Sequence, residues 1–144
     1  MFVKMSNLAA FTAIVALGNL VIAIWHLRLA SELNPALSFG QAARIGVLMA
    51  VLTLGGVILL WARLRLTGSL VLVVVFAIGL VIGSLEHFFI PGPNNVFDAG
   101  VGGVAFLFRI NVALLVVLEI AGLWGAARLI RSAWPSARRG RQLL

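Results

Sequence analysis

One stretch of the chain, residues 110–124, is apolar enough to lie in a membrane and yet contains a carboxylate, Glu119. A carboxyl group in hydrocarbon is costly unless it is neutralised or paired, so such a residue is a candidate for function. Counting along the apolar segments places Glu119 near the middle of its span, level with Asn19, Thr53 and Gly79. The sequence therefore predicts a band of polar and small residues at one depth.

Three interpretations of Glu119 remain open at this point. A protonated Glu119 could donate a hydrogen bond to Asn19 or to a backbone carbonyl and join two helices. It could instead cycle its proton and couple it to the movement of a cationic or polar solute. The third interpretation makes Glu119 a contact for a partner subunit or for a bound quinone-like or lipid ligand.

The two histidines of the chain form a second candidate site. His26 and His87 each lie about one turn from the end of an apolar segment, and these segments run in the same direction. Facing imidazoles at one depth could ligate the iron of a haem b, with Gly83 leaving room for the macrocycle. Together with Glu86 and Glu32 they could instead hold zinc or copper. In the alternative interpretation, each histidine bonds a neighbouring acid or carbonyl.

Hydrolytic chemistry is not expected from this sequence. The chain has no cysteine, which excludes disulfides and thiolate metal sites. It also lacks a Gly-x-Ser-x-Gly elbow and a His-Glu-x-x-His pair. The glycine-rich connection at 90–103 has no P-loop lysine. A non-enzyme is the favoured class, without a nucleic-acid partner.

These residues must be positioned by membrane-spanning helices. The 144 residues are 62% hydrophobic and 10% charged, whereas soluble domains are about half apolar and about a quarter charged. An apolar run of about 20 residues spans the hydrocarbon core. We expect one all-α domain, a four-helix up-down-up-down transmembrane bundle followed by a basic tail. The predicted helices are 8–29, 42–62, 70–89 and 104–130, and the tail is 131–144.

The basic residues are unevenly divided between the two ends of this bundle. Eight lie at the end that holds both termini and three at the other end, which together account for all 11. The positive-inside rule then places both termini in the cytoplasm, and the composition suggests the inner membrane of a bacterium. The larger group is Lys4, Arg63, Arg65, Arg128, Arg131, Arg138, Arg139 and Arg141, and the smaller is Arg28, Arg44 and Arg109.

The C-terminal tail combines Trp134 with Arg138, Arg139 and Arg141. An indole and several guanidinium groups suit the surface of a membrane that contains anionic lipids. The tail could thus lie on lipid headgroups. It could equally be solvated and serve only to set the topology.

The long connection at 90–103 is expected to lie across the mouth of the bundle. Phenylalanines in this connection and directly before it would dip into the membrane interface. Asp98 could pair with Arg28, Arg44 or Arg109. Exposed pairs of this kind contribute only about 0–1 kcal/mol, so they would fix the position of the loop more than the stability of the fold. The phenylalanines are Phe88, Phe89 and Phe97.

Small residues spaced by four recur on three of the predicted helices. Such ridges let helix backbones approach closely, within one bundle or between copies. Sequence alone does not separate these two uses. The pairs are Gly79 and Gly83, Gly46 and Ala50, and Gly122 and Ala126.

The favoured function is a small non-catalytic integral membrane subunit or scaffold. It would pack against other membrane chains or against copies of itself. The alternatives are an oligomeric proton-coupled transporter of small solutes that uses Glu119, and a haem b- or quinone-binding electron-transfer component that uses His26 and His87.

Overall fold

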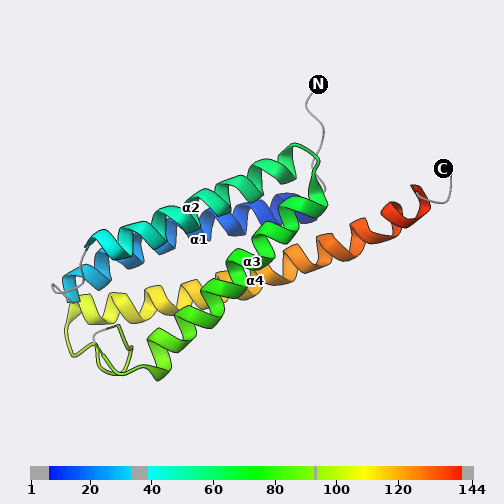
Figure 1. Cartoon of the computed structure of the whole chain (residues 1–144). Helices are drawn as coiled ribbons and strands as arrows, with labels where there is room; N and C mark the ends of the chain where they lie inside the picture. The colour runs from blue at the N-terminus through cyan, green and yellow to red at the C-terminus, as the bar shows by residue number, and fades with distance from the viewer. Residues whose placement is uncertain (1–6, 34–38, 93, 141–144) are drawn as a thin grey trace.

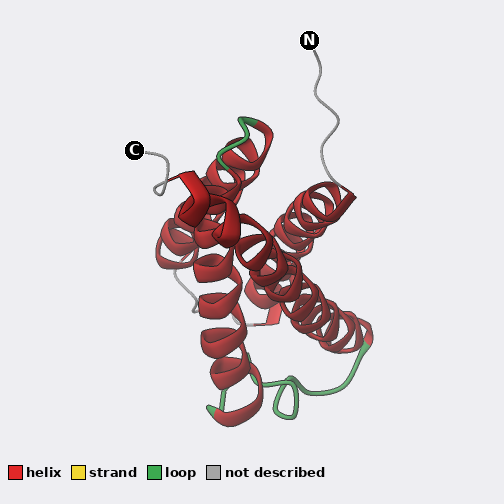
Figure 2. Cartoon of the chain, turned by 90° about the vertical axis from the view of Figure 1, so that its right-hand side faces the viewer, coloured by secondary structure: helices red, strands yellow, loops and turns green. Residues whose placement is uncertain are grey.

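Helices make up most of the described part of the chain. The computed structural model describes residues 7–33, 39–92 and 94–140, with the side chains of 39–45 and 134–140 outside that description. No strand occurs among the described residues, and a tight turn at 62–64 and a longer loop after residue 89 separate the helices there (Figure 2). The elements are α1 (Asn7–Leu33), α2 (Phe39–Trp61), α3 (Arg65–Ser84), the π-helix η1 (Leu85–Phe89) and α4 (Gly103–Gly140).

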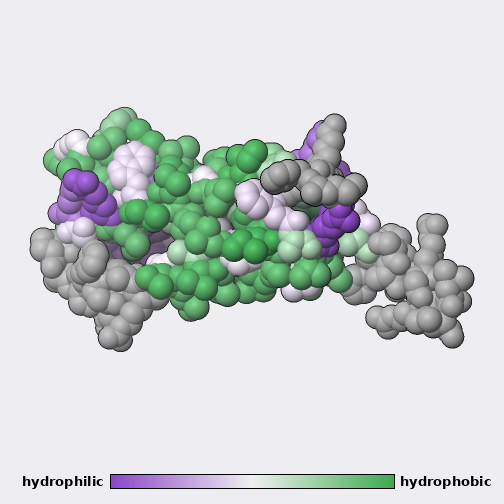
Figure 3. All heavy atoms as spheres, turned by 90° about the horizontal axis from the view of Figure 1, so that it is seen from above, coloured by the Kyte–Doolittle hydropathy of each residue, from purple (hydrophilic) through white to green (hydrophobic). Residues whose placement is uncertain are grey.

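Three helical stretches are long and apolar enough to span a membrane. They are Asn7–Leu33, Arg65–Phe89 and Gly103–Ala133, and a shorter apolar stretch, Gly46–Trp61, lies in α2. On the face shown in Figure 3, apolar residues cover most of the length of the bundle, and polar residues gather near its two ends. Lipid requires backbone groups to be satisfied within a segment, which helices achieve. These features are those of a membrane protein.

Each helix packs against its neighbours in the chain, and α4 closes the bundle by packing against α1 as well as α3. Helix α1 begins at the same end of the bundle as α4 ends, and we call this the terminal end (Figure 1). The connection between η1 and α4 lies at the opposite end, which we call the loop end.

All four helices extend beyond their predicted limits, and α2 and α3 begin at Phe39 and Arg65, before the predicted starts at residues 42 and 70. Helix α1 continues to Leu33, past the predicted end at residue 29, and α4 continues to Gly140 through most of the predicted tail. Alanine, leucine and arginine, which favour helices, dominate residues 126–131 and carry the helix past the apolar segment. The side chains of Trp134, Arg138 and Arg139, and all of Arg141, lie outside the described part, so their predicted contact with lipid stays a prediction.

The small-residue ridges are used inside the bundle. A methyl group added to Gly122 would overlap the buried Phe76 ring of α3, and one added to Gly46 would lie 2.9 Å from the Leu27 side chain of α1. Glycine at these positions therefore permits contact between neighbouring helices of one chain. Gly83 differs, because the nearest atom to an added methyl there belongs to His87 on the same stretch of helix, at 3.9 Å.

Candidate functional site

The two histidines meet at the loop end of the bundle. The rings of His26, on α1, and His87, on η1, are in edge-to-face contact with their centroids 4.7 Å apart. The common depth predicted from the sequence is therefore seen as direct contact. The π-helix η1 places His87 here, and such π turns are frequently found at functional sites.

Hydrogen bonds fix the protonated nitrogen of both rings. Nδ1 of His26 donates to Oδ1 of Asn111 at 2.9 Å, and Nδ2 of Asn111 donates to the carbonyl of Ile22 at 3.1 Å. Nδ1 of His87 donates to the carbonyl of Asn94 at 2.8 Å. Because both acceptors are carbonyl oxygens, each neutral imidazole carries its proton on Nδ1 and a lone pair on Nε2.

An aromatic ring completes the cluster. Phe108 of α4 is fully buried, and its centroid lies 5.2 Å from that of His26 and 5.8 Å from that of His87. The same ring belongs to the apolar core at this end, with Leu29, Ala30, Val96 and Val112. The histidine rings therefore contact the apolar core of the loop end through Phe108.

This arrangement does not suit a haem. Two histidines on opposite faces of one iron, with bonds of about 2 Å as at other metals, would have centroids about 6 Å apart. The observed rings touch at 4.7 Å, which leaves no space for a macrocycle between them.

The carboxylates considered as further metal ligands also lie elsewhere. Glu86 is exposed, and Glu32 accepts a hydrogen bond from Nε of Arg28 at 3.2 Å. Within the described residues, no three His, Cys, Asp or Glu side chains are grouped in a way that could hold a metal ion. A metal site at this end would have two imidazoles and no carboxylate ligand.

The loop between η1 and α4 is bound to both elements by specific hydrogen bonds. The amide of Val96 donates to the carbonyl of His87 at 2.9 Å. Nε of Arg109 donates to the carbonyl of Val96 at 2.9 Å, and Nη2 donates to the carbonyl of Gly100 at 2.8 Å. These hydrogen bonds tie the described part of the loop to η1 on one side and to α4 on the other.

Asp98 has a different partner from those expected. Its Oδ2 accepts a hydrogen bond from the amide of Gly92 at 3.0 Å. Arg109 binds loop carbonyls and Arg28 binds Glu32, while the side chain of Arg44 lies outside the described part. The Asp98 carboxylate therefore closes the turn between residues 92 and 98 within the loop.

The polar residues at mid-depth are buried but do not form a network. Thr53 donates to the carbonyl of Met49 on its own helix at 2.7 Å. Oδ1 of Asn19 is buried with no hydrogen-bond partner among the described residues, so the proposed bond from Glu119 to Asn19 is not formed. The carboxyl of Glu119 instead packs against Gly79 on α3. Thr53, Asn19 and Glu119 are thus each buried, and no hydrogen bond described in the structure joins any two of them.

Sequence reasoning missed Asn111, Asn94 and Phe108. Asn111 carries the strongest signal in hindsight, because it is an amide inside an apolar span, close to the loop end where the histidines were expected. An amide in lipid needs a partner, and His26 was available at that depth. The role of the Asn94 carbonyl depends on the loop conformation and has no comparable signal.

Fold and site together define a helical membrane protein with two histidine rings in contact at one end, each hydrogen-bonded to an asparagine carbonyl. Comparisons with family models, with curated proteins and with solved structures give no match.

Proposed function

We propose that this chain is a small non-catalytic integral membrane subunit that packs against other membrane chains. One observation carries the proposal: the polar side chains best suited to chemistry are engaged in joining helices and loop. His26 and Asn111 link α1 to α4, His87 binds the loop, and Arg109 binds the loop from α4. Such bonds hold a bundle in one shape.

The alternative functions find less support. A cavity at the loop end is lined by residues from η1, the loop and α4, none of them at mid-depth. A carrier that uses Glu119 would need space beside its carboxyl group, which is packed against Gly79. A haem-based carrier of electrons would need the histidine rings further apart.

In this proposal the chain crosses the inner membrane of a bacterium four times, with both termini in the cytoplasm. The support is the excess of basic residues at the terminal end, eight against three, together with the start of α1 and the end of α4, which both lie at that end (Figure 1). The loop end then faces the outside.

Reporter fusions test this orientation. A phosphatase that is active only outside the cytoplasm should be active when inserted at Val101, which is fully exposed in the loop, and inactive when fused to the C-terminus. A fluorescent protein that matures only in the cytoplasm should give the opposite pattern. Phosphatase activity at the C-terminus would contradict the proposed topology.

The outward side of α2 is the surface we assign to a partner helix. Leu54 and Ile58 are exposed there, and Gly55 faces open space, with no atom within 4 Å of an added methyl. A glycine among large side chains gives no advantage against lipid, but it allows the backbone of another helix to approach. We therefore expect contact with a partner to centre on this part of α2.

Site-specific photo-crosslinking tests this assignment. A photoreactive amino acid at Ile58 should give a discrete protein adduct in intact membranes. The matched control is Val74 on α3, which is similarly exposed but has no adjacent glycine that faces open space, and it should react with lipid alone. Equal protein adducts at both positions, or none at Ile58, would contradict the assignment to α2.

A further inference from the structure

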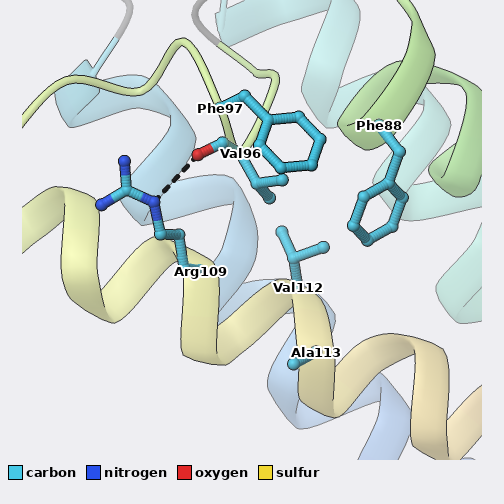
Figure 4. Close-up of a pocket in the computed structure, with 6 residues that line it drawn as sticks. All are labelled: Phe88, Val96, Phe97, Arg109, Val112 and Ala113. Atoms are coloured by element: carbon cyan, nitrogen blue, oxygen red, sulfur yellow. Dashed lines mark hydrogen bonds between the residues drawn. The ribbon is translucent and has the colours of Figure 1, made fainter.

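A second site lies beside the histidine cluster, on the outward side of the loop end. A cavity of about 190 Å³ is bounded by η1, the loop and α4 (Figure 4). Five of its six lining residues are apolar, and the sixth is Arg109. In Figure 4 the phenyl rings stand on one side of the cavity and the guanidinium group on the other. The apolar residues are Phe88, Val96, Phe97, Val112 and Ala113.

The guanidinium group of Arg109 has donors to spare. It has five N–H bonds, of which the Nε hydrogen and one Nη2 hydrogen are used by the carbonyls of Val96 and Gly100. Three N–H bonds thus remain for an outside acceptor. The two loop bonds also hold the side chain in place, which lowers the entropy lost when an acceptor binds.

No carboxylate of the described residues neutralises this cation. Asp98 accepts from the Gly92 amide, and the described ion pair of the chain joins Arg28 to Glu32. Arg109 lies close to the start of α4, at the end of an apolar span, where lipid headgroups meet the protein. The guanidinium group of Arg109 therefore places a positive charge at the depth of the lipid headgroups, next to an apolar cavity.

We propose that this cavity binds an anionic glycerophospholipid, with its phosphate on the free N–H groups of Arg109 and part of an acyl chain in the cavity, against the rings of Phe88 and Phe97, which contact each other edge-to-face. Arginine recognises phosphate through paired charge-assisted hydrogen bonds. The apolar wall accepts hydrocarbon, and the single cation matches the single charge of a headgroup such as phosphatidylglycerol. This lipid site is separate from the basic C-terminal residues and does not depend on the proposed subunit function.

Lipid retention by the purified full-length chain tests the site. The protein in a mild detergent is mixed with phosphatidylglycerol or phosphatidylcholine of identical acyl chains, and bound lipid is counted by native mass spectrometry. One basic group near an anionic headgroup contributes about 1 kcal/mol. We therefore expect the wild-type chain to retain phosphatidylglycerol about fivefold better than phosphatidylcholine.

Four variants locate the effect. Arg109→Gln should abolish the preference, whereas Arg109→Lys keeps the charge and should preserve it even if the loop is less firmly held. Ala113→Phe fills the cavity without touching the cation and should lower retention of phosphatidylglycerol. Val117→Phe adds the same ring about one turn away on the exposed side of α4 and should leave retention unchanged.

Three results of these retention measurements would overturn the proposal, and a competition experiment adds a fourth. These are equal retention of both lipids by the wild-type chain, a preference that survives Arg109→Gln, and full retention in Ala113→Phe. Oleate is added as a competitor in a separate titration. Displacement of phosphatidylglycerol by oleate at equal concentration would assign the cavity to fatty acids and would also overturn the phospholipid assignment.

Discussion

Replacing Gly79 with alanine is expected to destabilise the bundle by about 1–3 kcal/mol, the typical cost of forcing a methyl group into a filled interior. The added Cβ would overlap Oε1 of Glu119 and lie 3.0 Å from its Cδ. Because the Glu119 side chain is buried, its carboxyl end has to find a new position inside the bundle to make room for the methyl group. Unfolding in mixed detergent micelles, followed by circular dichroism, measures the loss.

A double-mutant cycle identifies the cause of this loss. In a Glu119→Ala background the carboxyl group is absent, so Gly79→Ala should cost much less, with a coupling energy of about 2 kcal/mol. The matched control is Gly18→Ala, since nothing lies within 4 Å of an added methyl there. It should leave stability unchanged or raise it by up to about 1 kcal/mol, because alanine favours a helix more than glycine does. Equal costs of Gly79→Ala in both backgrounds would mean that Glu119 does not face Gly79.

Replacing Asn111 with leucine is the second change with a large expected effect, again about 2–3 kcal/mol. The amide of Asn111 accepts from His26 and donates to the Ile22 carbonyl, and it is fully buried. Leucine would leave the Nδ1 proton of His26 without its acceptor in an apolar environment, and an unsatisfied buried donor costs about 1–3 kcal/mol. The same unfolding measurement detects this change.

Asn19→Leu is the matched control, because it removes a side-chain amide of the same kind. The Oδ1 atom of Asn19 is buried without a hydrogen-bond partner among the described residues. Removing a polar atom that has no partner should leave stability unchanged or raise it. If Asn19→Leu proves as costly as Asn111→Leu, the hydrogen bonds described here do not account for the stability of the loop end.

The number of helices and their approximate positions could be predicted from the length and composition of the apolar segments. Four helices are observed over the four predicted ranges, because apolar runs of about 20 residues with turn residues between them leave few other solutions. The similar depth of His26 and His87 also followed from the direction of their helices, whereas the contact between their rings is a finding of the structure. These properties depend only on position along a helix.

Properties that depend on rotation about the helix axis could not be predicted. Glu119 and Asn19 lie at a similar depth, but Glu119 points to Gly79 and is not bonded to Asn19. The pairing of His26 with Asn111 likewise requires two particular helix faces to meet. Depth can be counted along a sequence, whereas the facing of two helices is set by packing of the whole bundle.

The conformation of the loop was beyond prediction for another reason. Asp98 was expected to pair with an arginine on a helix, yet it binds the amide of Gly92, and Arg109 binds two loop carbonyls instead. Gly92 and Gly100 adopt positive φ angles, which open turns that other residues rarely enter. The backbone conformation of the loop therefore determines which hydrogen-bond partners Asp98 and Arg109 have.

The role of the chain as a subunit is tested most directly by native mass spectrometry after mild detergent extraction from its own membrane. The proposed function predicts a complex of defined stoichiometry, either with a different membrane chain or with further copies of this one. The interaction should weaken when Gly55, on the outward side of α2, is replaced by leucine. A lone monodisperse monomer, recovered under conditions that preserve other membrane complexes in the same sample, would contradict the proposal.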